Sequence, residues 1–273
     1  MANTITKKLS FLFSASGDLS LRKKFKQKFA KQGHSVFIAC MPKSGSTFLS
    51  KAIAQSYQFD ISYLNYGFER NEQELYLPAL IDNYSRNTVT QQHIKATAPN
   101  ITLMREFGIR PIILVRNIFD VVISIRDYLL KEGVENFPSL YASDSFVSLT
   151  ETQQYDFIIA NALPWYFNFY ASWTDASNSG QIDAKWVNYD RLKEDWHGGI
   201  KSIIDFYGLA YDSVTIDQTI NSLTQDKLGS RINKGIAGRG KTLLSGKQQA
   251  DIKAYRHFYP WIDFTSIGIE KNN

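Results

Sequence analysis

Cysteine is almost absent from the chain, which has one, Cys40, among 273 residues. One cysteine forms no disulfide within the chain and no multi-cysteine zinc site, so nothing here asks for an oxidising compartment. Long apolar runs are missing too, because polar residues and a glycine interrupt the N-terminal KKLSFLF stretch before it reaches the length of a signal peptide or membrane span. We therefore expect a soluble, cytoplasmic protein.

Close histidine pairs, repeats and low-complexity tracts are also lacking, and we infer no metal from the four scattered histidines, His34, His93, His197 and His257. Charge is only mildly unbalanced. With 31 basic and 26 acidic residues, the net charge of +5 favours an anionic partner. This balance does not choose between a nucleotide, a nucleic acid and a membrane.

Apolar runs alternate with helical patterns from residue 35 onward, which is typical of an α/β protein. We expect a single α/β domain over residues 33–262, with a central, mostly parallel sheet flanked by helices. An N-terminal basic helical extension, 1–32, would precede it, and a C-terminal tail, 263–273, would follow.

The stretch MPKSGSTFL, residues 41–49, lies between a predicted buried strand, SVFIACM, and a predicted helix. Free N–H groups at a helix start attract phosphate, Lys43 adds a charge, and Gly45 allows a tight turn. The lysine precedes the glycine, unlike in the G-x-x-x-x-G-K-[ST] loop of nucleotide triphosphatases. An ordinary serine or threonine helix cap with a surface lysine remains the alternative.

A second strand-to-helix unit is PIILVRNIFDVVISIRDYLL, residues 111–130. Arg116 falls where the strand ends, Asn117 is a candidate N-cap, and Ser124 lies about two turns into the helix. A magnesium-dependent triphosphatase is expected to have an acidic residue at such a strand end, whereas an arginine suits a phosphate monoester. The alternative is an arginine in a surface salt bridge.

Together the two stretches resemble the sulfotransferases of bacterial or cytosolic type that use 3′-phosphoadenosine 5′-phosphosulfate (PAPS), which have a P-loop-like architecture. PKSGSTFL resembles their 5′-phosphosulfate loop, and RNIFDVVIS resembles their 3′-phosphate motif. The resemblance implies that Arg116 and Ser124 hold the 3′-phosphate. It implies a 5′-phosphosulfate cradle made of Lys43, Ser44, Gly45, Ser46 and Thr47.

A third stretch, NKGIAGRGK at 233–241, resembles the family's glycine-rich K-G-x-x-G segment, which closes over the 3′-phosphate side of the nucleotide. The resemblance makes Lys234, Gly235 and Arg239 candidate nucleotide contacts. The family often has an arginine where this chain has Asn233, so we expect Arg231 or Arg239 to replace it. The alternative is a plain solvated loop.

Adenine recognition rests on two aromatic candidates. Many relatives have a tryptophan where this chain has Phe48, and a flat ring there would stack on a base. KWVNYD, at 185–190, resembles the family strand that ends in a tyrosine and an acid, which makes Tyr189 an adenine neighbour. The alternatives are that Phe48 belongs to the helix core and that Tyr189 is an ordinary buried residue.

The general base departs from the family pattern. Many relatives have a K-T-H-L-P-like segment, and aligning KATAP, 95–99, with it puts Thr97 at the histidine position. His93, at the end of the predicted strand TVTQQHI, accepts a proton more readily than Thr97, and both share a face if the strand continues. We assign His93 as the base and Lys43 as the group that stabilises charge on the leaving phosphate; a structural sheet histidine is the alternative.

These expectations describe an enzyme that moves a sulfuryl group in line from PAPS to a hydroxyl or amine of a small-molecule or glycan acceptor, leaving 3′-phosphoadenosine 5′-phosphate (PAP). The resemblance requires no metal and no nucleic acid. Aromatic residues of 163–173, together with 129–146, are expected to form the acceptor pocket. One alternative is a nucleotide-dependent small-molecule kinase, which needs ATP and magnesium. Another is a non-catalytic basic anion- or membrane-binding module that uses the N-terminal helix, 21–32, for peripheral membrane contact.

Overall fold

The structure, a computed structural model, describes residue 29 and residues 31–67, 73–134, 137, 140–225 and 238–270. Its centre is a sheet of five parallel strands in the order β2-β3-β1-β4-β5. The strands are β1 (Ser35–Cys40), β2 (Asp60–Ser62), β3 (Thr88–Gln92), β4 (Pro111–Val115) and β5 (Lys185–Asn188). The prediction of a single α/β domain with a central parallel sheet is confirmed.

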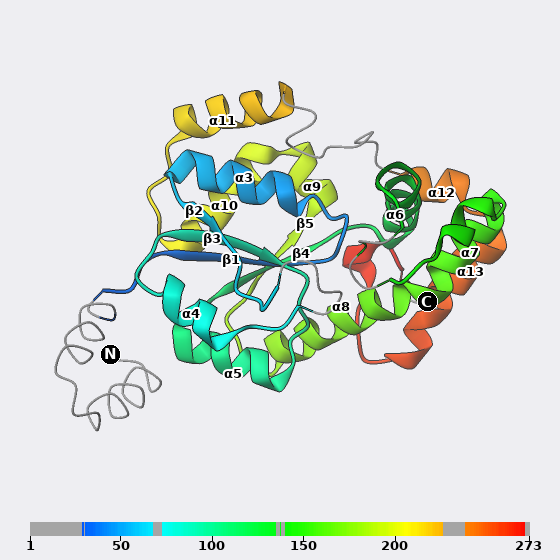
Figure 1. The fold of residues 1–273 in the computed structure, drawn as a ribbon, viewed down its shortest axis with the longest axis horizontal. Coiled ribbons are helices and arrows are strands. Elements are labelled where there is room, and N and C mark those ends of the chain that lie inside the picture. The colour runs from blue at the N-terminus through cyan, green and yellow to red at the C-terminus, as the bar shows by residue number, and fades with distance from the viewer. Residues whose placement is uncertain are drawn as a thin grey trace.

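Helices cover both faces of the sheet, with α3, α10 and α11 on one side and α4, α5 and α8 on the other (Figure 1). The described helices are α3 (Ser46–Tyr57), α4 (Leu77–Asn83), α5 (Ala98–Phe107), α6 (Ile118–Glu132), α7 (Glu151–Asn161), α8 (Leu163–Asn178), α9 (Tyr189–Glu194), α10 (Trp196–Tyr207), α11 (Ser213–Gln225), α12 (Arg239–Leu243) and α13 (Gly246–Ala254). Short 3-10 turns are η1 (Asp144–Ser148), η2 (Tyr255–Phe258) and η3 (Thr265–Ile267).

The continuous apolar sequence of β1 follows from this two-sided burial. Successive side chains of a strand point to opposite faces, and all of β1 from Val36 to Cys40 is buried. Phe37 and Ala39 enter the core beneath α4, α5 and α8, whereas Ile38 and Cys40 enter the core beneath α3 and α10. The predicted strand over 35–41 is confirmed to within one residue.

Because all five strands are parallel, their carboxyl ends meet at one edge of the sheet. Cys40 pairs with Leu114, Ala39 pairs with Gln92, and Val115 pairs with Asn188. The residues that follow β1, β3, β4 and β5 therefore emerge side by side, although long stretches of sequence separate them.

Helix α6 begins at this edge, immediately after β4. The Asn117 carboxamide oxygen accepts hydrogen bonds from the N–H groups of Phe119 and Asp120, at 3.0 and 3.4 Å. This confirms the predicted N-cap, which satisfies two of the N–H groups that a helix start leaves open. The predicted strand-to-helix unit over 111–130 is therefore confirmed.

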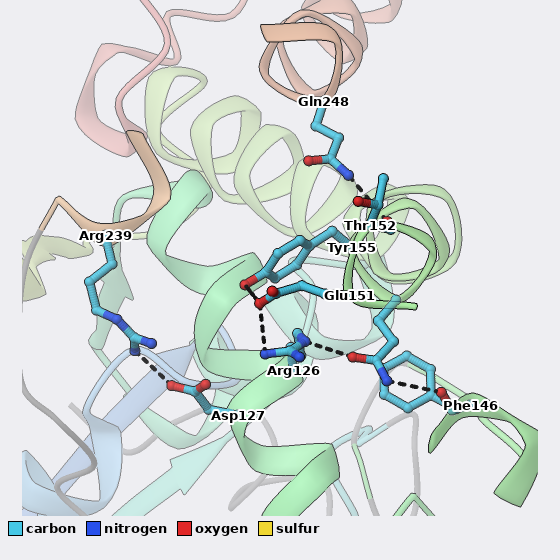
Figure 2. Close-up of polar contacts among 9 residues, drawn as sticks. Arg126, Asp127, Phe146, Glu151, Thr152, Tyr155, Arg239 and Gln248 are labelled. Atoms are coloured by element: carbon cyan, nitrogen blue, oxygen red, sulfur yellow. Dashed lines mark hydrogen bonds and ion pairs between the residues drawn. The ribbon is translucent and has the colours of Figure 1, made fainter. Parts of the chain in front are cut away.

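Polar contacts fix α7 and α12 onto α6, as Figure 2 shows. The Arg126 guanidinium donates to Gln154 at 2.7 Å and pairs with Glu151 at 3.1 Å, joining α6 to α7. Arg239 of α12 pairs with Asp127 of α6 at 2.6 Å, and both side chains are largely buried. Together these contacts hold α6, which begins at the edge where the carboxyl ends of the strands meet, against two neighbouring helices.

Asp120 is the strongest link between α6 and the C-terminal part of the chain. Its carboxylate, 2% exposed, accepts hydrogen bonds from the N–H groups of Gly238 and Gly240, both at 2.7 Å. A side chain at Gly240 would overlap the backbone of Phe119, so the close approach requires glycine.

The residues at the two ends of the chain can be compared with the predicted domain limits, 33 and 262. Residues 1–28 and 30, and with them most of the basic helix expected over 21–32, lie outside the described residues. At the other end, Phe264, Ile267 and Ile269, from the segment predicted as a tail, are buried in the core beside α8. None of the described helices has the length and apolar character needed to cross a membrane.

We expect Asp120→Ala to lower the free energy of unfolding by about 2–4 kcal/mol, because it removes the acceptor of two backbone N–H groups, of which that of Gly240 is buried and that of Gly238 is partly buried. Urea unfolding measures this change. Asp251→Ala is the control: its ion pair with Lys247 is largely exposed and screened by solvent, so its removal should cost little stability. Equal losses in the two variants would show that Asp120 does not anchor α12.

Candidate functional site

The loop between β1 and α3 has an unusual backbone. Lys43, which is not a glycine, has φ of 64°, and Gly45 has φ of 80°. Both values lie in the left-handed region, which side chains disfavour; strained non-glycine residues such as Lys43 cluster at functional sites. Gly45 occupies the N-cap position of α3, and no side chain caps that helix start with a hydrogen bond among the described residues. The loop therefore presents a helix N-terminus next to a lysine.

The loop hydroxyls differ in their surroundings. Ser44 is fully buried, and its hydroxyl donates to the Met41 carbonyl at 2.6 Å, so it braces the loop from inside. Ser46 is also buried, and its side chain lowers the pKa of the Cys40 thiol, against the larger effect of burial, which raises it. Thr47, in the first turn of α3, is half-buried.

Arg116 connects the two predicted phosphate motifs. Its Nη1 donates to the Lys43 carbonyl at 2.9 Å, which ties the end of β4 to the loop after β1. Its Nε is buried and has no hydrogen-bond partner among the described residues. An unpaired buried guanidinium N–H is costly, and an anion would satisfy it.

Tyr189 packs directly against this loop. It follows β5 and begins α9, one residue beyond the end of the strand. A side chain at Gly45 would overlap the Tyr189 ring, so the glycine allows the ring to pack closely against the loop. The Arg116 guanidinium also lies 5.1 Å from the centre of that ring. The structure therefore brings Lys43, Arg116 and Tyr189 together.

Phe48 belongs to the hydrophobic core that also includes Tyr189. It is 2% exposed, and its ring centre lies 4.3 Å from that of Trp196. Trp196 is half-buried and meets the Tyr189 ring edge to face at 6.4 Å. Phe48 thus packs against Trp196, which in turn contacts Tyr189.

Two of the remaining nucleotide candidates, Ser124 and Arg239, lie on α6 and α12. Ser124 is buried on the face of α6 that also carries Asp120, one turn away. Arg239 is paired with Asp127. Lys234 and Gly235, together with Asn233 and Arg231, lie outside the described residues.

His93 follows β3 directly and reaches across to the end of β1. Its Nδ1 lies 3.0 Å from the Cys40 carbonyl oxygen. Because a carbonyl only accepts, Nδ1 carries the proton and Nε2 has the free lone pair. The His93 backbone N–H donates to Gln73 Oε1 at 2.7 Å, which fixes the main chain at this point.

Thr97 takes a different place. β3 ends at Gln92, so the alternation that would put His93, Lys95 and Thr97 on one face does not continue. Thr97 instead precedes α5 as its N-cap residue, and its hydroxyl lies 3.4 Å from Glu74. His93 faces the loop end of β1, whereas Thr97 belongs to the start of a helix.

Electrostatics couples His93 to Lys43. Burial lowers the pKa of His93 to about 4, the hydrogen bond to the Cys40 carbonyl opposes this shift, and the positive charge of Lys43 adds to it. His93 is therefore neutral at pH 7. The Lys43 ammonium itself lies 4.2 Å from the centre of the Tyr128 ring.

Sequence reasoning missed three residues that shape the site: Gln73, Asp190 and Tyr166. Gln73 holds the His93 backbone, and Tyr166 donates to the Pro42 carbonyl. Asp190 accepts from the Asn117 N–H at 3.0 Å, and burial raises its pKa. Only Asp190 had a signal in the sequence, as the acid that follows Tyr189 in KWVNYD.

We expect the pKa of His93 to make the protein less stable in acid. The unfolded chain takes up a proton near pH 6.5 and the folded chain only near pH 4, so stability is lost as pH falls through this window. The loss has a ceiling of roughly 3–4 kcal/mol, because each pH unit between the two pKa values contributes about 1.4 kcal/mol. Urea unfolding between pH 7 and pH 4 should show a shallower decline for His93→Gln, which cannot titrate. Parallel curves for the two proteins would contradict this pKa.

Comparison with known proteins identifies the family. The sequence matches the sulfotransferase domain family over residues 34–233. The fold is similar to that of mouse sulfotransferase SULT7A1 complexed with PAP, with a TM-score of 0.64 and 15% sequence identity over 88% of this chain and 89% of that chain. It is also similar to retinol dehydratase in a complex with retinol and PAP, with a TM-score of 0.56 and 14% identity over 92% and 88% of the two chains.

No curated protein matches the sequence significantly. At identities this low, the structural similarities establish the fold, and the family match rests on the sequence itself. That match covers the β1–α3 loop, the end of β4 with α6, and His93. The chain belongs to the sulfotransferase domain family.

Proposed function

We propose that this sulfotransferase uses PAPS as its sulfuryl donor and releases PAP. The observation that carries the proposal is the junction of Lys43 and Arg116, where a helix start, a lysine and an unpaired guanidinium N–H meet at one edge of the sheet. The two structural neighbours described above were crystallised with PAP. The geometry and these neighbours support the same ligand class.

The residues present fit a phosphosulfate at the loop. The Met41, Pro42 and Lys43 carbonyls each accept a side-chain hydrogen bond, which partly offsets the negative charge of these oxygens beside an anion. We assign the 5′-phosphosulfate to the helix start, including the N–H groups of Gly45, Ser46 and Thr47, with Lys43. We assign the 3′-phosphate to Arg116 and Ser124, with a contribution from Lys234, Gly235 and Arg239 as the sequence predicts.

Adenine binding follows from the aromatic group beside the loop. Tyr189 lies on Gly45, and Trp196 meets it edge to face. We assign the base to the side of Tyr189 and Trp196, with Phe48 packed beneath Trp196. Aromatic faces of this kind stack on bases.

The chemistry falls to His93 and Lys43. When bound, PAPS supplies an activated sulfuryl group on a good leaving group. His93 Nε2 has the lone pair that removes the acceptor proton, and Lys43 stabilises the negative charge that develops at the loop. Gln73 and the Cys40 carbonyl hold the imidazole in this tautomer and place.

We propose a hydroxyl or amine of a small molecule or glycan as the acceptor. Retinol dehydratase, which shares the fold, was crystallised with retinol, a small alcohol. The aromatic segment expected to form the pocket is α8, most of whose rings are buried; its Tyr166 and Trp173 donate to the main chain next to Lys43 and His93. We therefore expect α8 to support the two catalytic segments as well as line the acceptor side.

The kinase alternative lacks support at the end of β4. Arg116 stands where an acidic residue would organise magnesium, and both nearby carboxylates, Asp120 and Asp190, accept hydrogen bonds from backbone N–H groups. The basic-module alternative depends on residues 21–32, most of which lie outside the described part of the chain.

We expect PAP to raise the melting temperature in the presence of EDTA, because a ligand of the native state at 100 times its Kd adds about 2.7 kcal/mol of stability.

Arg116→Ala should weaken PAP binding by roughly 2–4 kcal/mol in calorimetry. Arg110→Ala is the matched control, since Arg110 precedes the same strand at its other end and pairs with Asp183. A larger rise in melting temperature with ATP and magnesium than with PAP would favour a kinase instead.

Turnover should separate the roles of His93, Lys43 and Thr97. His93→Ala is expected to lower kcat about 10²-fold or more with little change in PAP affinity, the usual effect of losing a general base. Lys43→Ala should lower both kcat and PAP affinity, because its charge acts in the ground state and the transition state. PAP release with an accepted hydroxyl compound provides the assay. If Thr97→Ala were more damaging than His93→Ala, the base would be misassigned.

A further inference from the structure

Three consecutive carbonyls of the β1–α3 loop each accept a hydrogen bond from a side chain. The Ser44 hydroxyl donates to Met41 at 2.6 Å, and Arg116 Nη1 donates to Lys43 at 2.9 Å. Between them, the Tyr166 hydroxyl donates to the Pro42 carbonyl at 3.1 Å. Ser44 and Arg116 belong to the predicted phosphate motifs, whereas Tyr166 comes from α8, 124 residues away in sequence.

The position of Tyr166 explains how Lys43 keeps a strained conformation. A non-glycine residue in the left-handed region costs about 1–3 kcal/mol of conformational free energy, and it persists only where surrounding contacts hold it in place. The carbonyl on each side of the Lys43 Cα is held, one by Tyr166 and the other by Arg116. These two bonds fix the peptide planes on both sides of the strained residue.

Helix α8 is a rigid carrier for this hydroxyl. Tyr166 is fully buried, and the same helix is tied to the segment after β3. Trp173 Nε1 donates to the Ile94 carbonyl at 2.9 Å, and the Ala96 N–H donates to the Ser172 hydroxyl at 3.1 Å. One helix therefore contacts the main chain next to both Lys43 and His93.

We infer that Tyr166 is a positioning residue for the phosphosulfate loop, acting through the peptide between Pro42 and Lys43. In a trans peptide the carbonyl and the N–H point in opposite directions, so holding the Pro42 oxygen toward α8 turns the Lys43 N–H to the other side of the loop. The bond also helps to hold the Lys43 backbone in its left-handed conformation, which sets the direction of the Lys43 side chain. The role in catalysis rests on the proposed function, whereas the hold on the loop does not.

Tyr166→Phe and Tyr170→Phe make a matched pair. Both tyrosines lie on α8, both are buried, and each hydroxyl donates to one backbone carbonyl: Tyr166 to Pro42 in the loop, and Tyr170 to Asp263, at 2.9 Å. Each variant removes one hydroxyl that donates to a carbonyl; the Tyr170 bond is only partly buried, so Tyr170→Phe is expected to cost no more global stability than Tyr166→Phe. The effect on the loop should differ.

Hydrogen–deuterium exchange of the ligand-free proteins tests the hold on the loop. Peptides covering residues 41–48 should exchange about 5-fold or more faster in Tyr166→Phe than in wild type, and at the wild-type rate in Tyr170→Phe. PAP affinity, measured by calorimetry, should fall about 5- to 10-fold in Tyr166→Phe only. Equal exchange in the two variants, or PAP affinity unchanged by Tyr166→Phe, would overturn the inference.

The two proposals fail in different ways. Wild-type protein that does not bind PAP would refute the proposed function, and the exchange comparison would still decide whether Tyr166 holds the loop. Wild-type protein that binds PAP, combined with equal exchange in both variants, would leave the function standing and remove Tyr166 from it.

Discussion

The site depends on a backbone constraint: the chain must pass from the buried strand β1 into α3 through two left-handed residues, Lys43 and Gly45. At Gly45 the missing side chain relieves the strain and leaves room for the Tyr189 ring. At Lys43 the strain remains, and hydrogen bonds from Tyr166 and Arg116 hold the neighbouring carbonyls. The strand order makes this possible, because β4 and β5 end beside β1.

Charge is distributed so that the loop remains attractive to an anion. Two carboxylates lie close to α6, yet neither accepts an ion pair from Arg116 among the described contacts. Asp120 accepts two glycine N–H groups, and Asp190 accepts the N–H of Asn117. Burial raises the pKa of Asp190, while that backbone bond and the charge of Arg116 lower it. The Nε of Arg116 thus keeps a buried N–H that no described group accepts.

The local pattern of the sequence was enough to predict the elements that frame the site. The apolar runs of β1 and β4, the loop between β1 and α3, and the Asn117 cap depend on residues close together in the chain, and the structure confirms them. The resemblance to sulfotransferases was carried by these short stretches, and the family match supports it.

Contacts between distant segments were not predictable in this way. The Tyr166 bond to Pro42 and the Asp120 bonds to Gly238 and Gly240 join residues more than 100 positions apart. Nothing in the sequence around Tyr166 separates it from the other aromatic residues of α8, which are buried for packing. For Phe48, the structure keeps the ring beneath Trp196, and sequence alone left core packing and base stacking equally open.

In the proposed mechanism, the electrostatic coupling between Lys43 and His93 would make the basicity of His93 depend on whether an anion is bound at Lys43. In the ligand-free protein, burial and the positive charge of Lys43 both lower the pKa of His93, to about 4, which makes the imidazole a weak base. An anion that neutralises Lys43 removes one of these two contributions, and its own negative charge favours the imidazolium, so the pKa rises toward the range in which a general base is effective. The bond from Nδ1 to the Cys40 carbonyl is compatible with either protonation state, since Nδ1 carries a proton in both. The imidazole can therefore gain and lose a proton at Nε2 without changing the contact that holds it in place.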